Sequence, residues 1–213
     1  MAKKKNGSAD KKTVLVIFVE GDTEDEFYNK MVKSIQEKAG QSLCEVEIKV
    51  LKGVGRYQSK AGRIFENGIK DKYPGYRYVV ALCYDTDVFA YSSKPPVNWD
   101  DVTKTLIDMG ADQVTQVRAD KSIEDWFLYD MEGLRSFLRI SPKVKLPAST
   151  YRGQEGLRKL FLKANKTYNK GVRCSGIVDA LDMDKIFPHI CSEIRVICQT
   201  IGTDCSAVNE RCK

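Results

Sequence analysis

The sequence predicts an α/β fold, with an open, mostly parallel β-sheet covered by helices on both faces and a helical C-terminal extension. Two short runs, residues 13–19 and 77–84, are almost entirely apolar and rich in β-branched residues, as strands buried on both faces of a parallel sheet are. Strand-like segments also alternate with helix-like segments along the first 130 residues, which is the pattern of repeated βαβ units. Hydrophobic residues make up 42% of the chain, enough for a packed core.

The first strand and helix can be placed from local signals. After the strand at 13–19, the segment Thr23-Glu24-Asp25-Glu26 fits a capping box, with Thr23 as the N-cap and Glu26 at the third helical position. We therefore expect a helix from about residue 24 to residue 38, ended by Gly40.

The later elements follow from the same patterns of periodicity and turn residues. Residues 44–51 alternate in polarity and predict a strand near the sheet edge, and Ser122 is expected to begin a further helix. The remaining predictions are a helix over 58–71, a strand over 77–84, a helix over 99–109, a strand over 113–118 and helical structure over 177–201.

Charge divides the chain into three parts. Residues 1–12 contain five lysines and one aspartate, so they supply +4 of the net charge of +6 and are expected to form a disordered basic tail. Residues 13–135 are predicted to form the main domain, and residues 136–213 a mainly helical extension that includes a basic segment. No run approaches the ~18 apolar residues of a membrane helix. No apolar stretch follows the first lysines as in a signal peptide, so we expect a cytoplasmic protein without a membrane partner.

The positions of the seven cysteines indicate that they pack in the protein core and do not bind metal. Cys191, Cys198, Cys205 and Cys212 recur every seven residues, but this spacing does not match structural zinc sites. Cys191 and Cys198 fall on an apolar helical face that ends at Gly202. We expect reduced cysteines, which suits a cytosolic location.

Three carboxylates follow predicted strands. Glu20 comes directly after the first strand, and Asp85 and Asp87 come at the end of the third. Ligand sites of open α/β sheets form beyond the carboxyl ends of the strands, so these side chains should face one crevice. Clustered like charges need a cation or a basic partner, and carboxylate oxygens suit Mg²⁺ or Mn²⁺. The residues therefore predict a metal site suited to phosphodiester chemistry.

The segments Glu20-Gly21-Asp22-Thr23-Glu24 and Asp85-Thr86-Asp87 together resemble the TOPRIM domain. That domain is shared by topoisomerases, bacterial primases, small RNA-maturing nucleases and nucleases of the overcoming-lysogenization-defect family. The resemblance covers about residues 13–130. Ser122-Ile123-Glu124 is similar to the serine/threonine-x-glutamate that follows the paired aspartates in the lysogenization-defect nucleases.

The resemblance implies a metal-dependent endonuclease that acts on DNA or RNA, tRNA included. Glu20 would be a general base or acid or a metal ligand, Asp85 and Asp87 would coordinate metal, and Glu24 and Glu124 would support a pair of Mg²⁺ or Mn²⁺ ions. Small proteins of this kind are toxic effectors of bacterial anti-phage systems, often silenced by an ATPase partner. No ATPase domain is recognisable in this sequence.

Several of these residues also have simple structural explanations. Glu24 and Glu124 lie in first helical turns, where the helix dipole favours acids, and Asp87 could simply begin a turn. Glu20 and Asp85 end apolar strands, where no capping rule requires an acid. The basic residues expected to contact nucleic acid are equally compatible with a solvated surface; they are Lys52, Arg56, Lys60, Lys121, Lys166 and Lys170.

Two other functions fit parts of the pattern. A paired-aspartate motif after a strand also holds Mn²⁺ in nucleotide-sugar glycosyltransferases, but that reading leaves Glu20 unexplained. The fold could instead serve as a non-catalytic nucleic-acid-binding or regulatory TOPRIM module. The sequence leaves the substrate open, and homo-oligomers are compatible with it.

Overall fold

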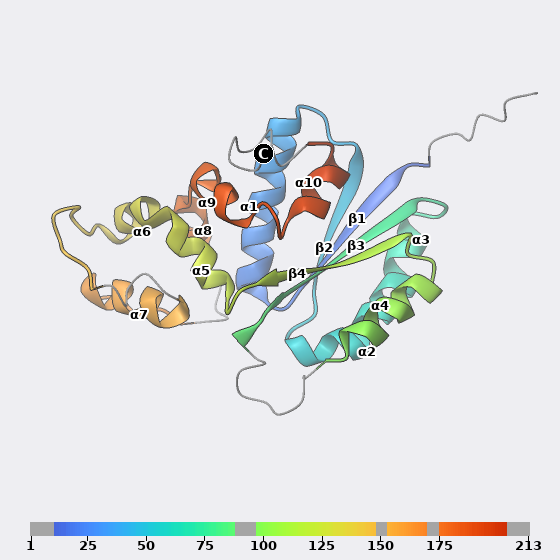
Figure 1. Ribbon diagram of the computed structural model, residues 1–213, viewed down its shortest axis with the longest axis horizontal. Helices are drawn as coiled ribbons and strands as arrows, with labels where there is room; N and C mark the ends of the chain where they lie inside the picture. The colour runs from blue at the N-terminus through green and yellow to red at the C-terminus, as the bar shows by residue number, and fades with distance from the viewer. Residues whose placement is uncertain (1–10, 88–96, 148–152, 170–174, 204–213) are drawn as a thin grey trace, which may run out of the picture.

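The computed structural model describes residues 11–87, 97–147, 153–169 and 175–203. Four parallel strands form one sheet in the order β2-β1-β3-β4 (Figure 1). Their bounds are β1 Thr13–Val19, β2 Cys44–Val50, β3 Arg77–Asp85 and β4 Gln113–Ala119. Each lies within one residue of its predicted range, because the apolar runs and their flanking turns are strong signals.

Helices cover both faces of the sheet, so the predicted fold class is confirmed. On one face lie α1 (Asp22–Ala39) and α10 (Arg195–Ile201), and on the other lie α2 (Tyr57–Ile64) and α4 (Trp99–Asp108) (Figure 1). Alternate strand residues point to opposite faces, which gives two hydrophobic clusters. Val14, Val16 and Phe18 belong to the cluster under α2 and α4, whereas Leu15, Ile17 and Val19 belong to the cluster under α1 and α10.

The predicted helix over 58–71 is continuous but not uniform. A short 3₁₀ turn, η1 (Val54–Arg56), leads into α2, which continues through the π-helical η2 (Phe65–Ile69) into α3 (Lys70–Lys72). Its buried side chains Tyr57, Ala61, Phe65 and Ile69 recur every four residues and pack on the sheet.

The predicted capping box on α1 is wrong. Gly21 is the N-cap, and the helix already begins at Asp22, so Thr23 lies inside the first turn. Its Oγ1 is buried without a hydrogen-bond partner among the described residues. The earlier start places Asp22, Glu24 and Asp25 in the first turn, where acids are favoured by the exposed backbone N–H groups.

The C-terminal extension packs against the sheet domain in the same core. It follows α5 (Ile123–Phe127) and η4 (Leu128–Asp130), and the hydrophobic cluster under α1 and α10 continues from the sheet into it. The helix α6 (Met131–Leu138) spans the predicted boundary at residues 135–136, and the helices after it are α7 Gly153–Lys163, α8 Ser175–Ala180, α9 Met183–Ile190 and α10. No helix in the described part of the chain is long and apolar enough to cross a membrane.

The predicted helical region 177–201 is divided into three helices. The first ends at Ala180, and Asp182 begins the second as its N-cap, because its side chain accepts a hydrogen bond from the N–H of Asp184. A turn over 191–194 separates α9 from α10 and redirects α10 onto the sheet. Gly202 ends α10 with a left-handed conformation (φ 113°), as expected.

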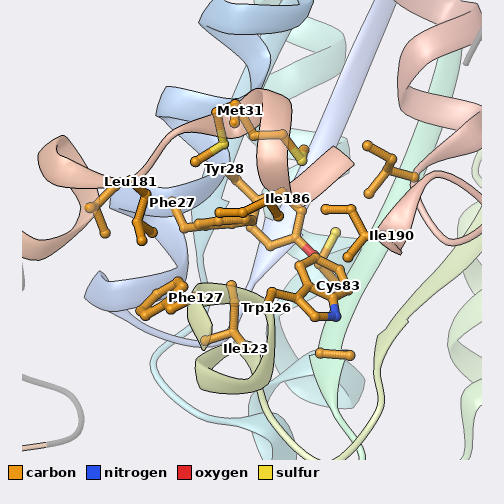
Figure 2. Packing of buried hydrophobic residues seen from close by; sticks show 14 of the residues in the cluster. Phe27, Tyr28, Met31, Cys83, Ile123, Trp126, Phe127, Leu181, Ile186 and Ile190 are labelled. Atoms are coloured by element: carbon orange, nitrogen blue, oxygen red, sulfur yellow. The ribbon is translucent and has the colours of Figure 1, made fainter. Parts of the chain in front are cut away.

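Aromatic and aliphatic side chains from α1, α5 and α9 pack together. In Figure 2, Phe27, Trp126, Phe127, Ile186 and Ile190 point toward one another, and the Phe27 and Phe127 rings lie 5.3 Å apart. Trp126 and Phe127 are 4% and 0% exposed. They are therefore core residues, which excludes a role for them in stacking on nucleic acid bases.

The prediction that all cysteines are reduced is wrong for two of them, because a disulfide takes two thiols. Cys44, Cys83 and Cys198 are not in disulfides, and burial raises the pKa of Cys83 to about 12. Cys191 is disulfide-bonded. It lies half-buried just after α9. Cys205 and Cys212 lie outside the described residues.

A buried glutamate on the edge strand β2 makes stability depend on pH. Burial alone would raise the pKa of Glu47, but hydrogen bonds from Lys49 (2.7 Å), Lys72 and Tyr73 (2.7 Å) outweigh it and hold the pKa at about 2, below the ordinary 4.5. The stabilisation is complete above the unfolded pKa and is lost as the pH falls from about 4.5 to about 2.

We expect Glu47→Gln to lower the free energy of unfolding by on the order of 2 kcal/mol at pH 7. The difference between the variant and the wild type should shrink below about pH 4.5 and be mostly lost at pH 2, where Glu47 is protonated in the unfolded state and about half protonated in the folded state. Urea unfolding at pH 7, 5, 3 and 2 measures this. A difference that stays constant with pH would contradict the assignment.

Candidate active site at the carboxyl ends of the strands

The structure brings Glu20 and Asp85 into direct contact. Glu20 follows β1 and Asp85 ends β3, and these strands are neighbours in the sheet. The Asp85 N–H donates a hydrogen bond to Glu20 Oε1 (3.1 Å). Asp85 is 3% exposed and Glu20 is half-buried. The two acids therefore share one edge of the sheet, as their positions in the sequence predict.

The loops after β3 and β4 hold each other in place. The N–H groups of Thr86 and Asp87 donate to the carbonyl oxygens of Ala119 (3.1 Å) and Lys121 (2.8 Å). In return, the Lys121 N–H donates to Thr86 Oγ1 (2.7 Å). These bonds order the backbone of the paired aspartates and place half-buried Asp87 beside the β4 loop.

Both strand-end acids also have structural roles that the sequence did not indicate. Asp85 Oδ1 accepts a hydrogen bond from the Ile123 N–H (2.9 Å) at the start of α5, and Glu20 accepts the Asp85 N–H. Ser122 is the N-cap residue of α5 by its backbone, as predicted, but its own side chain makes no capping bond. Asp85 supplies the acceptor instead.

Glu24 and Tyr57 lie near Glu20 and Asp85. Glu24, in the first turn of α1, is 8% exposed, and a Cβ on Gly21 would lie only 3.1 Å from Glu24 Oε2. The Tyr57 hydroxyl donates to the Phe18 carbonyl oxygen (3.1 Å) and also contacts that of Cys83. Burial raises the pKa of Tyr57 well above its ordinary value, and nearby charges, including Glu20, Glu24 and Asp85, raise it further. The three acids therefore all lie close enough to the Tyr57 hydroxyl to affect its pKa.

Glu124 is the most deeply buried of the predicted site residues, at 0% exposure. The hydroxyl of Tyr168 donates to its Oε1 (2.8 Å), whereas Oε2 is buried without a hydrogen-bond partner among the described residues. Its neighbour Asp125 accepts a hydrogen bond from the Gly153 N–H (2.6 Å), and burial raises the pKa of Asp125. The sequence signals did not predict either contact.

The carboxylates fit a hard divalent cation only in part. Within the described ranges, no group of three or more His, Cys, Asp or Glu side chains is arranged to hold a metal ion. Mg²⁺, however, is usually bound through one or two carboxylates, with waters and substrate phosphates completing its shell. The unsatisfied Oε2 of Glu124 suits such an ion, because a buried carboxylate oxygen without a donor is costly.

Two of the predicted basic residues flank the acids. Lys52 precedes Gly53, whose N–H donates to the Glu20 carbonyl oxygen (2.8 Å), and Lys121 lies in the loop bonded to Asp87. Both lysines are exposed and have left-handed backbones, with φ values of 66° and 62°. Left-handed non-glycine residues are strained and concentrate at functional sites.

The other predicted basic residues have different surroundings. Arg56 is exposed on η1, and Lys60 Nζ donates to the Leu51 carbonyl oxygen (3.3 Å). Lys166 Nζ lies 5.1 Å from the centre of the Phe137 ring, so it is engaged within the extension. Lys170 lies outside the described residues.

A cleft of about 640 Å³ borders the site along the outer edge of β4. Thr86 and Asp120 line its end near the paired aspartates, and Arg118 and Arg195 line its sides. The other lining residues are Gln113, Thr115, Gln116, Ser192, Glu193, Val196 and Gln199. Sequence reasoning missed this cleft, because it forms only where α10 returns beside the edge strand.

The fold and the acids define an α/β protein with an acidic site at the carboxyl edge of a parallel sheet. Comparisons of the chain with protein-family models, with curated proteins and with solved structures find no match.

Proposed function

We propose that this protein is a Mg²⁺-dependent nuclease of the TOPRIM kind, which hydrolyses phosphodiester bonds in DNA or RNA. The observation that carries the proposal is the contact between Glu20 after β1 and Asp85 after the neighbouring β3. A glutamate after the first strand and an Asp-x-Asp segment after the third is the arrangement that the TOPRIM resemblance implies.

Each acid would have a defined part in this reaction. Asp85 and Asp87 would hold Mg²⁺ or Mn²⁺, and Glu24 and Glu124 would support a second ion. A pair of such ions would stabilise the charge that develops on the attacking and leaving oxygens. Glu20 would accept or return a proton at the reacting water or hydroxyl. Backbone donors orient Glu20 and Asp85 in advance, which limits the reorganisation needed for catalysis.

The basic residues support a nucleic acid substrate. Lys52 and Lys121 flank the acids on exposed loops and would contact phosphates on either side of the scissile bond. Lysines contact phosphate without reading base sequence, so these residues fit DNA, RNA and tRNA alike. The same resemblance supports a cytoplasmic effector of anti-phage defence under the control of an ATPase partner.

A non-catalytic nucleic-acid-binding module is the second candidate. It is favoured by the structural hydrogen bonds of Glu20 and Asp85, which give both acids a use without catalysis. The glycosyltransferase reading is weaker, since it assigns no role to the bond between Glu20 and Asp85.

Cleavage of plasmid DNA, single-stranded DNA and total tRNA by the purified protein distinguishes these candidates. We expect cutting of at least one substrate with Mg²⁺ or Mn²⁺ and none with EDTA. Binding that shifts a labelled substrate without cutting it, combined with no toxicity of the expressed protein in cells, would favour the non-catalytic module. Equal cutting with and without EDTA would exclude the proposed mechanism.

A further inference from the structure

Tyr168 connects the C-terminal extension to the acidic site. It lies beyond α7 and is separated from Glu124 by 44 residues, yet its hydroxyl donates to Glu124 Oε1 at 2.8 Å. Tyr168 is 4% exposed and Glu124 is 0% exposed, so the bond is shielded from water. A hydrogen bond between buried groups, one of them a carboxylate, is stronger and more directional than the same bond at the surface.

The surroundings of Tyr168 hold its ring in place. Its ring centre lies 5.4 Å from that of Phe161 on α7, and Phe161 in turn lies 6.4 Å from Phe137 on α6. Next to Glu124, Asp125 Oδ1 accepts the Gly153 N–H at the start of α7 (2.6 Å). Both ends of the segment from α7 to Tyr168 are therefore attached to α5, the helix that carries Glu124.

The two carboxylate oxygens of Glu124 differ in their hydrogen bonding. Oε1 accepts the Tyr168 hydroxyl, and Oε2 is buried with no hydrogen-bond partner among the described residues. A buried carboxylate oxygen without a donor is costly unless a cation or another donor reaches it. A bond that fixes one oxygen also fixes the rotation of the carboxylate, and hence the direction of the other oxygen.

We infer that Tyr168 is a positioning residue, which orients Glu124 so that Oε2 is presented to a divalent cation. The inference rests on the proposed function and extends it, because it makes residues 153–169 part of the site. Sequence reasoning treated this segment only as a basic surface for nucleic acid. Metal affinity would then depend on the docking of the extension against α5.

Calorimetric titration of the purified protein with Mn²⁺ alone tests this inference. We expect Tyr168→Phe to weaken Mn²⁺ binding about 10- to 100-fold, as loss of a group that orients a metal ligand does. The metal-free melting temperature should also fall, by about 4–10 °C, because the ring is kept but Oε1 of the buried Glu124 loses its donor. Tyr78→Phe is the matched control, because the buried Tyr78 hydroxyl donates to the Tyr73 carbonyl oxygen (2.6 Å) at the opposite end of β3.

A second variant separates positioning from general loss of structure. Glu124→Gln keeps the side-chain shape and an acceptor for Tyr168 but removes the charge. If Tyr168 acts through Glu124, Tyr168→Phe should weaken Mn²⁺ binding no further in the Glu124→Gln background. Additive losses in the double variant would overturn the inference, even if Tyr168→Phe alone were unstable.

The remaining outcomes separate this inference from the proposed function. Wild-type binding of Mn²⁺ together with unchanged affinity in Tyr168→Phe would overturn the inference and leave the nuclease proposal standing. Absence of Mn²⁺ binding by the wild type, with no metal-dependent cleavage, would overturn both.

Discussion

Asp85→Asn is expected to lower metal-dependent nuclease activity by at least about 100-fold without unfolding the protein. An asparagine keeps an oxygen that can accept the Ile123 N–H, so the start of α5 remains bonded, but it removes the charge that would hold the metal. Glu20→Gln should have an effect of the same size, because it keeps an acceptor for the Asp85 N–H. Alanine at either position would also remove the side-chain oxygen that accepts a backbone N–H. A loss of activity in the alanine variants could then result from a loss of stability.

Asp112→Asn is the matched control for both variants. Asp112 Oδ2 accepts the Tyr78 N–H (2.8 Å) at the opposite end of the sheet, so the same change is made to the same kind of bond away from the site. Cleavage rates and melting temperatures of all three variants should be measured in Mg²⁺. Wild-type rates in both Asp85→Asn and Glu20→Gln would refute the assignment of the active site.

Gly133→Ala is expected to lower the free energy of unfolding by on the order of 3 kcal/mol. A Cβ at this position would lie 2.1 Å from Asp130 Oδ2 and 2.6 Å from the Ala180 carbonyl oxygen. Asp130 is 0% exposed and accepts the N–H groups of Gly133 (3.0 Å) and Asp182 (2.7 Å). The added methyl group must therefore displace α8 or break a buried network that joins α6 to α9.

Gly68→Ala is the control for this prediction. Gly68 lies in the helical segment η2, it is exposed, and a Cβ there would meet nothing within 4 Å. Alanine should stabilise this position by roughly 0.5–1 kcal/mol through its helix propensity. Urea unfolding at neutral pH compares the two variants. Equal stability of Gly133→Ala and the wild type would show that α8 can move away from α6 without loss.

The predictable features of this protein were those that depend on neighbouring residues in the chain. The four strands were found within one residue, because short, β-branched apolar runs bounded by turn residues, such as 13–19, favour a buried strand. The meeting of Glu20 and Asp85 followed from parallel strands alone, since their carboxyl ends share one edge.

Local rules failed where the same residues are compatible with two different local structures. Thr23 is a good N-cap by type, but the helix begins two residues earlier with Gly21 as its cap. The apolar face over 187–201 has helical spacing, yet the turn at 191–194 breaks it so that α10 can return to the sheet. Tertiary packing outweighs local propensity in such cases, because it buries more apolar surface.

By itself, the sequence determined the strands of the sheet, the predicted helices on both of its faces and the acids at its carboxyl edge. These depend on hydrophobic periodicity and on the direction of parallel strands. Only the tertiary structure decided that Tyr168 bonds Glu124, that Asp85 caps α5 and that α10 forms a cleft beside β4. Such contacts join residues far apart in the chain, and they form because buried polar groups must find partners wherever the packing of the helices places them.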